Sequence, residues 1–122
     1  MKELLEEFKQ KIENIDITYD YGETYNNLYN AYIDYENETN DYDLEYLFED
    51  IIDYDMAEER ARYELEQGGL IRLYYFLGDA NLNNDIFRVD GYGNLQDIHK
   101  EDLEDLKQEI LERIEELESE VE

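Results

Sequence analysis

Residues 86–98, with the sequence Ile-Phe-Arg-Val-Asp-Gly-Tyr-Gly-Asn-Leu-Gln-Asp-Ile, decide the fold class of this chain. Apolar and β-branched residues at 86–89 and 95–98 flank a polar turn with two glycines, which is the pattern of an antiparallel β-hairpin. A two-stranded hairpin is marginally stable alone in water, so its apolar face must pack on helices. The sequence therefore predicts an α+β protein with one small hairpin.

The segment that follows, residues 100–120, predicts a long C-terminal helix. Asp97 and His99 are the candidate caps at its start. The apolar residues of this segment form a near-heptad stripe. This stripe could either cover the core or pair with a second copy of the chain, which would make the protein a homodimer. The stripe consists of apolar residues at spacings of three and four: Leu103, Leu106, Ile110, Ile114, Leu117 and Val121.

The first forty residues predict two further helices. Residues 2–14 carry one apolar stripe at helical spacing, and a second stripe begins after a loop at 16–22. Thr24 is the expected N-cap of the second helix, and residues 36–40 are expected to form a turn. Three tyrosines on the second stripe are expected in the core or at its rim, namely Tyr25, Tyr29 and Tyr32.

The centre of the chain predicts one or two more helices. A helix is expected from Asp43 onwards, because Leu44, Leu47, Phe48, Ile51 and Ile52 have helical spacing. Asp55 and Glu58 form a capping-box pattern, which leaves open whether residues 43–67 are one bent helix or two. Gly68-Gly69 ends the helix in either case. Residues 70–77 fit a helix or a strand, and we favour a short helix. The sequence thus predicts a mostly helical single domain, residues 1–122, with four to five helices.

The charge balance of the chain is extreme. It carries 36 acidic and 10 basic side chains, a net charge of -26 at pH 7, but its 42% hydrophobic content is typical of folded proteins. The absence of cysteine excludes disulfides and thiolate metal sites. Without a signal-peptide pattern or membrane span, the protein is expected in the cytoplasm. Because its surface would repel nucleic acid and anionic lipid, neither is an expected direct ligand.

The acidic charge is concentrated in residues 12–59. This stretch has no lysine or arginine, sixteen acids and nine of the thirteen tyrosines. A solvated face that keeps the protein soluble is one interpretation. Because like charges held close destabilise a compact protein, we favour a functional one: an imitation of the nucleic-acid backbone that binds a basic nucleic-acid-binding protein.

Carboxylates on a helix can imitate the spacing of charges in DNA. Duplex DNA carries one negative charge per about 1.7 Å of axis, and carboxylates on a helix that rises about 1.5 Å per residue can approach this density. Arginines that grip phosphates accept carboxylates in the same fork geometry, and tyrosines provide rigid contact area. The predicted partner-binding residues are the acids Asp34, Glu36, Glu38, Asp41, Asp43, Glu45, Glu49, Asp50, Asp53 and Asp55, with Tyr35, Tyr42, Tyr46 and Tyr54.

Catalytic residue types are scarce, so we expect neither an enzyme nor a cofactor. The chain has a single histidine, His99, no cysteine and no glycine-rich phosphate loop. Ser119 lies in the final turn of an acidic helix, without a serine elbow. Carboxylate pairs are too common here to indicate a glycosidase or phosphatase.

Residues 79–90 partly match a calcium-binding loop. Asp79, Asn81, Asn83 and Asp90 fall at positions one, three, five and twelve of such a loop. Asn84 replaces the usual glycine, Asp90 replaces the bidentate glutamate, and a hairpin follows in place of a helix. A polar loop is therefore the simpler interpretation, and a calcium-binding module stays an alternative.

Two segments of the second half suggest a family. Residues 73–79, Leu-Tyr-Tyr-Phe-Leu-Gly-Asp, and residues 86–95 leading into 100–106, Lys-Glu-Asp-Leu-Glu-Asp-Leu, are similar to small proteins of Gram-positive phages and mobile elements, among which anti-CRISPR proteins occur. The size and composition resemble the small acidic DNA mimics that inhibit restriction enzymes or CRISPR effectors. The resemblance implies a non-enzymatic inhibitor, in the cytoplasm of the host bacterium, that blocks the DNA-binding site of a defence nuclease.

An acidic structural or assembly protein is the alternative from another class. It would dimerise through the stripe at residues 103–121, and its acids would serve solubility.

Overall fold

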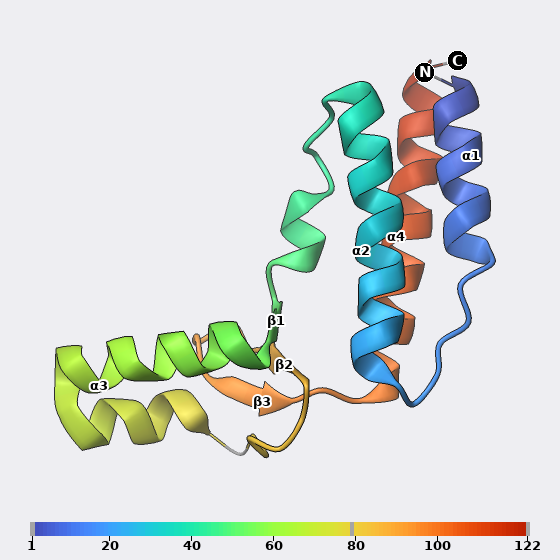
Figure 1. Ribbon diagram of the computed structural model, residues 1–122. Helices are drawn as coiled ribbons and strands as arrows, with labels where there is room; N and C mark the ends of the chain where they lie inside the picture. Colours follow the sequence, from blue (N-terminus) through green and yellow to red (C-terminus); the bar gives the residue numbers. More distant parts are fainter. Residues whose placement is uncertain (1, 79, 122) are drawn as a thin grey trace. The chain divides into compact units, whose positions relative to one another are not determined.

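The computed structural model describes residues 2–78 and 80–121, apart from the side chain of Val121. It divides into two compact units (Figure 1). Unit 1 comprises Met1–Phe48 and His99–Glu122, and unit 2 comprises Glu49–Ile98. Unit 2 is therefore an insertion between two segments of unit 1. The predicted class is confirmed, since the chain is mostly helical, with a small antiparallel sheet and a long C-terminal helix.

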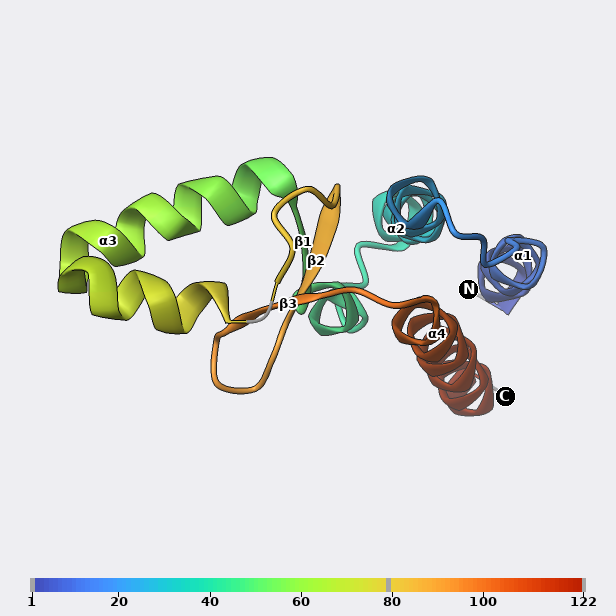
Figure 2. The same cartoon turned by 90° about the horizontal axis from the view of Figure 1, so that it is seen from below.

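Unit 1 is built from three helices packed side by side (Figures 1 and 2): α1 (Lys2–Glu13), α2 (Tyr21–Thr39) and α4 (Lys100–Val121). The α4 stripe covers the core of this unit, as one of the two alternatives predicted. A homodimer formed through the stripe would have to displace α1 and α2. Its five described members are all buried: Leu103, Leu106, Ile110, Ile114 and Leu117.

Of the two predicted caps of α4, His99 occupies the cap position and Asp97 does not. His99 directly precedes the helix, and its backbone N–H donates to the Asp102 carboxylate at 2.8 Å. This is the return half of a capping box. Asp97 instead accepts a hydrogen bond from the Asn84 side chain at 3.1 Å. His99 is therefore the N-cap residue of α4, and the first-turn carboxylate of Asp102 accepts from its backbone.

The boundaries of α2 differ from the prediction at both ends. Asp20 is the N-cap and accepts from the backbone N–H of Glu23 at 3.1 Å. Thr24, the predicted cap, is buried inside the helix and accepts from the backbone N–H of Thr18. The predicted turn at residues 36–40 is also wrong, because α2 continues to Thr39 and ends at Asn40 in the left-handed conformation. The polar residues 36–39 instead form the last, solvated turn of α2.

The helix predicted from residue 43 to residue 52 is wrong. A 3-10 helix, η1 (Glu45–Phe48), and a short strand, β1 (Ile51–Asp53), replace it. Apolar residues of this segment are nevertheless buried without a helix, namely Leu44, Phe48 and Ile51. β-branched Ile51 and Ile52 favour the extended conformation once a partner strand is present. Residues 43–67 are therefore neither one helix nor two.

Unit 2 holds the predicted hairpin, extended to three strands in the order β1-β2-β3. β2 (Ile86–Val89) pairs antiparallel with β3 (Leu95–Asp97) on one side and with β1 on the other, where Ile52 lies opposite Phe87. The sheet packs against α3 (Tyr54–Leu77). Their shared core contains Ala57, Phe76, Phe87 and Leu95.

A break at Gly69 divides α3 into two halves that fold back on each other (Figures 1 and 2). Asp53, not the predicted Asp55, caps the first half by accepting from the backbone N–H of Met56 at 2.8 Å. The predicted interruption at Gly68-Gly69 and the helix at residues 70–77 are both confirmed. None of the helices in residues 2–78 and 80–121 combines the length and apolar character that a membrane span requires.

Replacing Gly69 with alanine is expected to lower the free energy of unfolding by about 1–3 kcal/mol, because L-residues rarely adopt its backbone conformation. Gly69 has φ 73° and ψ -159°, and an added Cβ would meet no atom within 4 Å, so the cost is one of backbone strain alone. Gly91→Ala is the matched control, since Gly91 has equal space and no positive φ. Urea unfolding compares the two variants, and equal losses would contradict the prediction.

Candidate functional site

The predicted partner-binding residues are divided between the two units. The acidic tyrosine-rich stretch is therefore not one continuous helical surface, and each unit carries part of it. Unit 1 holds Asp34, Tyr35, Glu36, Glu38, Asp41, Tyr42, Asp43, Glu45 and Tyr46, and unit 2 holds Glu49, Asp50, Asp53, Tyr54 and Asp55.

Three of the four predicted contact tyrosines are exposed, and one is not. Tyr42, Tyr46 and Tyr54 expose 56%, 57% and 42% of their surface. Tyr35 is buried in the core of unit 1, where its ring stacks on Phe8 at a centroid distance of 4.7 Å. The prediction for Tyr35 is wrong because α2 continues past it and turns this residue toward α1.

The tyrosines predicted in or near the core are found there. Tyr32 is buried and stacks on Phe48 with ring centroids 5.0 Å apart. Tyr25 and Tyr29 surround the same phenylalanine, and the Tyr25 hydroxyl donates to the Phe48 backbone carbonyl at 3.2 Å. An aromatic cluster therefore anchors η1 to α2.

Several predicted acids have local structural roles. Asp41 accepts a hydrogen bond from the Tyr35 hydroxyl at 2.9 Å, and its other oxygen accepts from the backbone N–H of Asp43 at 3.0 Å. The carboxylate of Asp34 lies 3.7 Å from the ammonium of Lys11, although residues 12–59, to which Asp34 belongs, contain no lysine or arginine. The charge asymmetry of the sequence is thus partly offset in space by cations from other segments.

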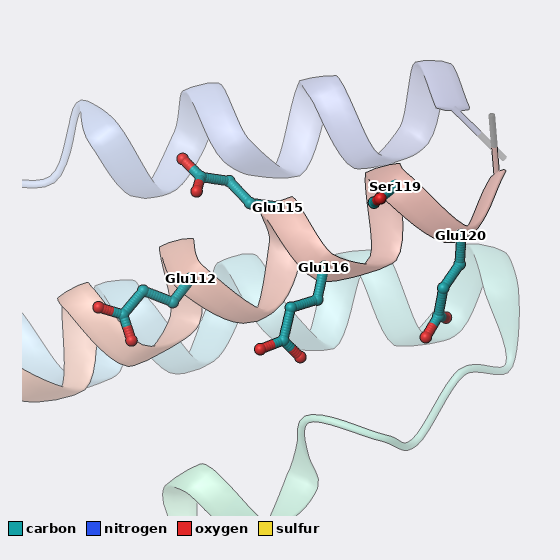
Figure 3. A pocket seen from close by; sticks show the side chains of 5 residues that line it. All are labelled: Glu112, Glu115, Glu116, Ser119 and Glu120. Carbon is teal, nitrogen blue, oxygen red and sulfur yellow. The ribbon is translucent and has the colours of Figure 1, made fainter.

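The glutamates of α4 form an acidic surface that the sequence reasoning missed. Figure 3 shows Glu112, Glu116 and Glu120 on one side of α4, while Glu115 points to the other side. Together with Ser119, these four residues line an open hollow. The intervals of four residues are the spacing of one helical ridge, and this regular spacing is the signal that could have identified the surface.

Arg113 contacts both this ridge and Asp43, one of the predicted partner-binding residues. Its guanidinium donates to Glu116 at 2.7 Å and lies 3.6 Å from the carboxylate of Asp43. The hydrogen bond to Glu116 raises the pKa of Arg113. Asp43 and Glu120 also line one pocket, so both segments contribute to one surface. We define the α4 acidic face as Asp43, Glu112, Glu116 and Glu120.

The carboxylate density of α4 approaches the charge density of a nucleic-acid strand. Ten acids lie within its 22 residues. Since a helix rises about 1.5 Å per residue, this is roughly one carboxylate per 3.3 Å, close to the spacing of about 3.4 Å between charges along one DNA strand.

The two lysines of α4 engage their own unit. The ammonium of Lys107 donates to the backbone carbonyl of Ile15 at 2.7 Å. The ammonium of Lys100 lies 5.1 Å from the ring centre of Tyr19 and 3.9 Å from the Glu104 carboxylate. The two lysines therefore do not neutralise the α4 acidic face, and Arg113 is the α4 cation that contacts it, through Glu116 and Asp43.

The residues of the predicted calcium loop form hydrogen bonds within the hairpin and within the loop that precedes it. Asp90 accepts from the backbone N–H groups of Tyr92 and Asn94, both at 2.9 Å, and from the Gln96 side chain. Asn81 accepts from the backbone N–H of Asn83 at 3.1 Å, while Asp79 lies outside the described residues. Among the residues that are described, no group of three or more His, Cys, Asp or Glu side chains could hold a metal ion.

No protein-family model, curated protein or solved structure matches this chain.

Raising the pH above about 10, where tyrosines of an unfolded chain lose their protons, is expected to destabilise the protein. Burial raises the pKa of Tyr32 and Tyr35, and the nearby carboxylates of Glu36 and Asp41, respectively, raise them further. The folded state keeps both protons while the unfolded state releases them, so this contribution is complete below about pH 10 and declines above it.

Urea unfolding at increasing pH measures this dependence. Tyr35→Phe is expected to lose stability less steeply in the alkaline range than the wild type, because one raised pKa has been removed. Tyr42→Phe is the matched control at an exposed position and is expected to follow the wild-type slope. Identical slopes for all three proteins would contradict the assignment to Tyr35.

Proposed function

We propose that the protein is a non-enzymatic inhibitor that imitates a nucleic-acid strand and blocks the nucleic-acid-binding site of a basic protein. A defence nuclease, in the first place a CRISPR effector, is the proposed target class. The observation that carries the proposal is the α4 acidic face, on a helix with ten acids in 22 residues.

The chemistry of the acidic face supports a basic partner. Carboxylates at intervals of four residues are about 6 Å apart along the helix axis, so several arginines or lysines can engage them at once. Arginine binds carboxylate and phosphate in the same bidentate geometry. A protein that reads DNA through such side chains would therefore accept this helix in place of the strand.

The exposed tyrosines add contact area beside the acids. Tyr42 and Tyr46 belong to the same unit as the α4 acidic face and are more than half exposed. Aromatic side chains with few rotatable bonds contribute to binding at low entropic cost. Unit 2 offers Tyr54 with exposed Glu49, Asp50 and Asp55, which we propose as a second contact region.

Long-range attraction governs the expected binding behaviour. A net charge of -26 should accelerate association with a basic protein and make the affinity fall as salt screens the charges. Competition with nucleic acid requires no catalysis by the inhibitor.

Affinity capture tests the proposed function. The full chain is immobilised and exposed to lysates that contain defence nucleases, and bound proteins are eluted with a salt gradient or with duplex DNA. We expect a basic nuclease that is released by both. Capture that responds to neither salt nor DNA would overturn the proposal. A variant with glutamine at residues 112, 116 and 120 should capture less of the same nuclease.

A further inference from the structure

The second half of α3 exposes a group of large apolar side chains. Leu70, Ile71, Tyr74 and Tyr75 expose 77%, 73%, 75% and 65% of their surface, and we call them the α3 patch. They occupy two adjacent ridges of one helix, Leu70 with Tyr74 and Ile71 with Tyr75, because the members of each pair are four residues apart. The rings of Tyr74 and Tyr75 lie 6.0 Å apart between centroids.

The α3 patch is held in a fixed position. Phe76, on the same half of α3, is buried in the core of unit 2. The buried carboxylate of Glu64, on the first half, accepts hydrogen bonds from Arg72 on the second half and from Arg60. This ion pair fixes the two halves to each other, so the exposed side of the helix is a preformed surface.

The size of the patch suits a protein interface. A buried tyrosine removes about 150–250 Å² from solvent, so four large side chains exposed by about three quarters present roughly 600 Å². The largest apolar patch of a typical monomer is about 300–600 Å² and is often functional. Two such patches facing each other would bury roughly 1,200 Å², the lower end of the range for specific protein interfaces.

The charge around the patch differs from that of the chain as a whole. Residues 60–78 contain three arginines and two glutamates, a net charge of +1, within a chain of net charge -26. Two copies of the chain repel each other wherever acidic surfaces meet, and they can approach closely where the charge is balanced. A basic partner is drawn to the acidic surfaces, and nucleic acid or anionic lipid is repelled by the chain.

We infer that the α3 patch is the interface of a symmetric homodimer, in which the same patch of a second copy covers it. A two-fold interface requires a self-complementary surface, and a nearly neutral apolar patch meets this requirement. This inference goes beyond the proposed inhibitor function and does not depend on it. A dimer would also carry two α4 acidic faces, which would allow bivalent binding of a target with two sites.

Sedimentation equilibrium of the full chain at about 0.05 M and about 0.5 M NaCl tests the dimer, because salt shortens the range of the repulsion between copies. We expect dimerisation to strengthen with salt, opposite to the expected salt dependence of target binding. The double variant Leu70→Gln/Tyr74→Gln should dimerise at least about tenfold more weakly, because it removes apolar area at the interface.

The matched control is Leu82→Gln/Tyr92→Gln, which replaces the same residue types at exposed positions of unit 2 outside α3. Its dimerisation should equal that of the wild type. Circular dichroism checks folding, and Tyr75→Gln provides a milder second variant. A monomeric wild type at high salt, or equal weakening in both double variants, would overturn the inference. Binding of the monomer to neutral lipid vesicles through the patch would overturn it as well.

Discussion

Neutralising Glu112, Glu116 and Glu120 together is expected to weaken binding to the basic target by roughly 100-fold or more at low salt. A hydrogen bond to a charged group contributes about 1.5–3 kcal/mol, and about 1.4 kcal/mol corresponds to a tenfold change in affinity. The three side chains lie on one side of α4 and line one open hollow (Figure 3). Glutamine keeps their size and helix propensity, so the variant changes mainly charge, although at residue 116 it also removes the ion pair with Arg113.

The matched control neutralises three other exposed acids of α4 at the same spacing of four, in Glu101→Gln, Asp105→Asn and Glu109→Gln. It changes the net charge equally but leaves the α4 acidic face intact. Isothermal titration calorimetry or surface plasmon resonance over a range of salt concentrations compares the two triple variants. The variant of the acidic face should lose affinity and show a shallower salt dependence. Equal losses in both would show that net charge alone, and not this face, determines binding.

Replacing Ile110 with alanine is expected to lower the free energy of unfolding by about 2–5 kcal/mol, as is usual for a buried isoleucine that leaves a cavity. Ile110 is 0% exposed and lies in the middle of the α4 stripe, against the other helices of unit 1. A loss of this size is a large part of the stability of a small protein, which is typically about 5–15 kcal/mol.

Chemical unfolding at low and high protein concentration also distinguishes a core stripe from an intermolecular one. The difference between Ile110→Ala and the wild type should be the same at both concentrations, because the stripe packs within one chain. Gln108→Ala, at an exposed position of the same helix, is the control and should change stability little. A difference that grows with concentration would indicate that the stripe pairs with a second copy.

Helices and strands whose conformation is determined by residues nearby in the sequence were predictable. The hairpin has its own turn, and α1 and α4 have strong apolar periodicity, so local pattern was sufficient for each. β1 was not predictable in this way, because Ile51 pairs with Arg88, far along the chain. Its apolar spacing resembled a helix, and pairing across the sheet decided the outcome.

The candidate site was predictable in its chemistry and less so in its position. The sequence gives the number of carboxylates, but ion pairs between segments, such as Lys11 with Asp34 and Arg113 with Asp43, appear only when the helices are packed. Tyr35 was predicted at the surface because it lies between two acids, directly before the turn expected at residues 36–40, whereas α2 continues to Thr39. Residues 12–59 contain no cation and α4 contains three, so charge asymmetry favoured the first stretch, although the regular spacing of the α4 glutamates was present in the sequence.

The insertion of unit 2 between η1 and α4 has a consequence for folding on the ribosome. α1 and α2 are synthesised first, but α4, which covers their apolar sides, follows only after all fifty residues of Glu49–Ile98. We therefore expect the middle of the nascent chain to acquire its structure before the beginning does. Until α4 emerges, mutual repulsion between the acidic N-terminal segments of neighbouring nascent chains should protect their unpaired apolar surfaces from aggregation.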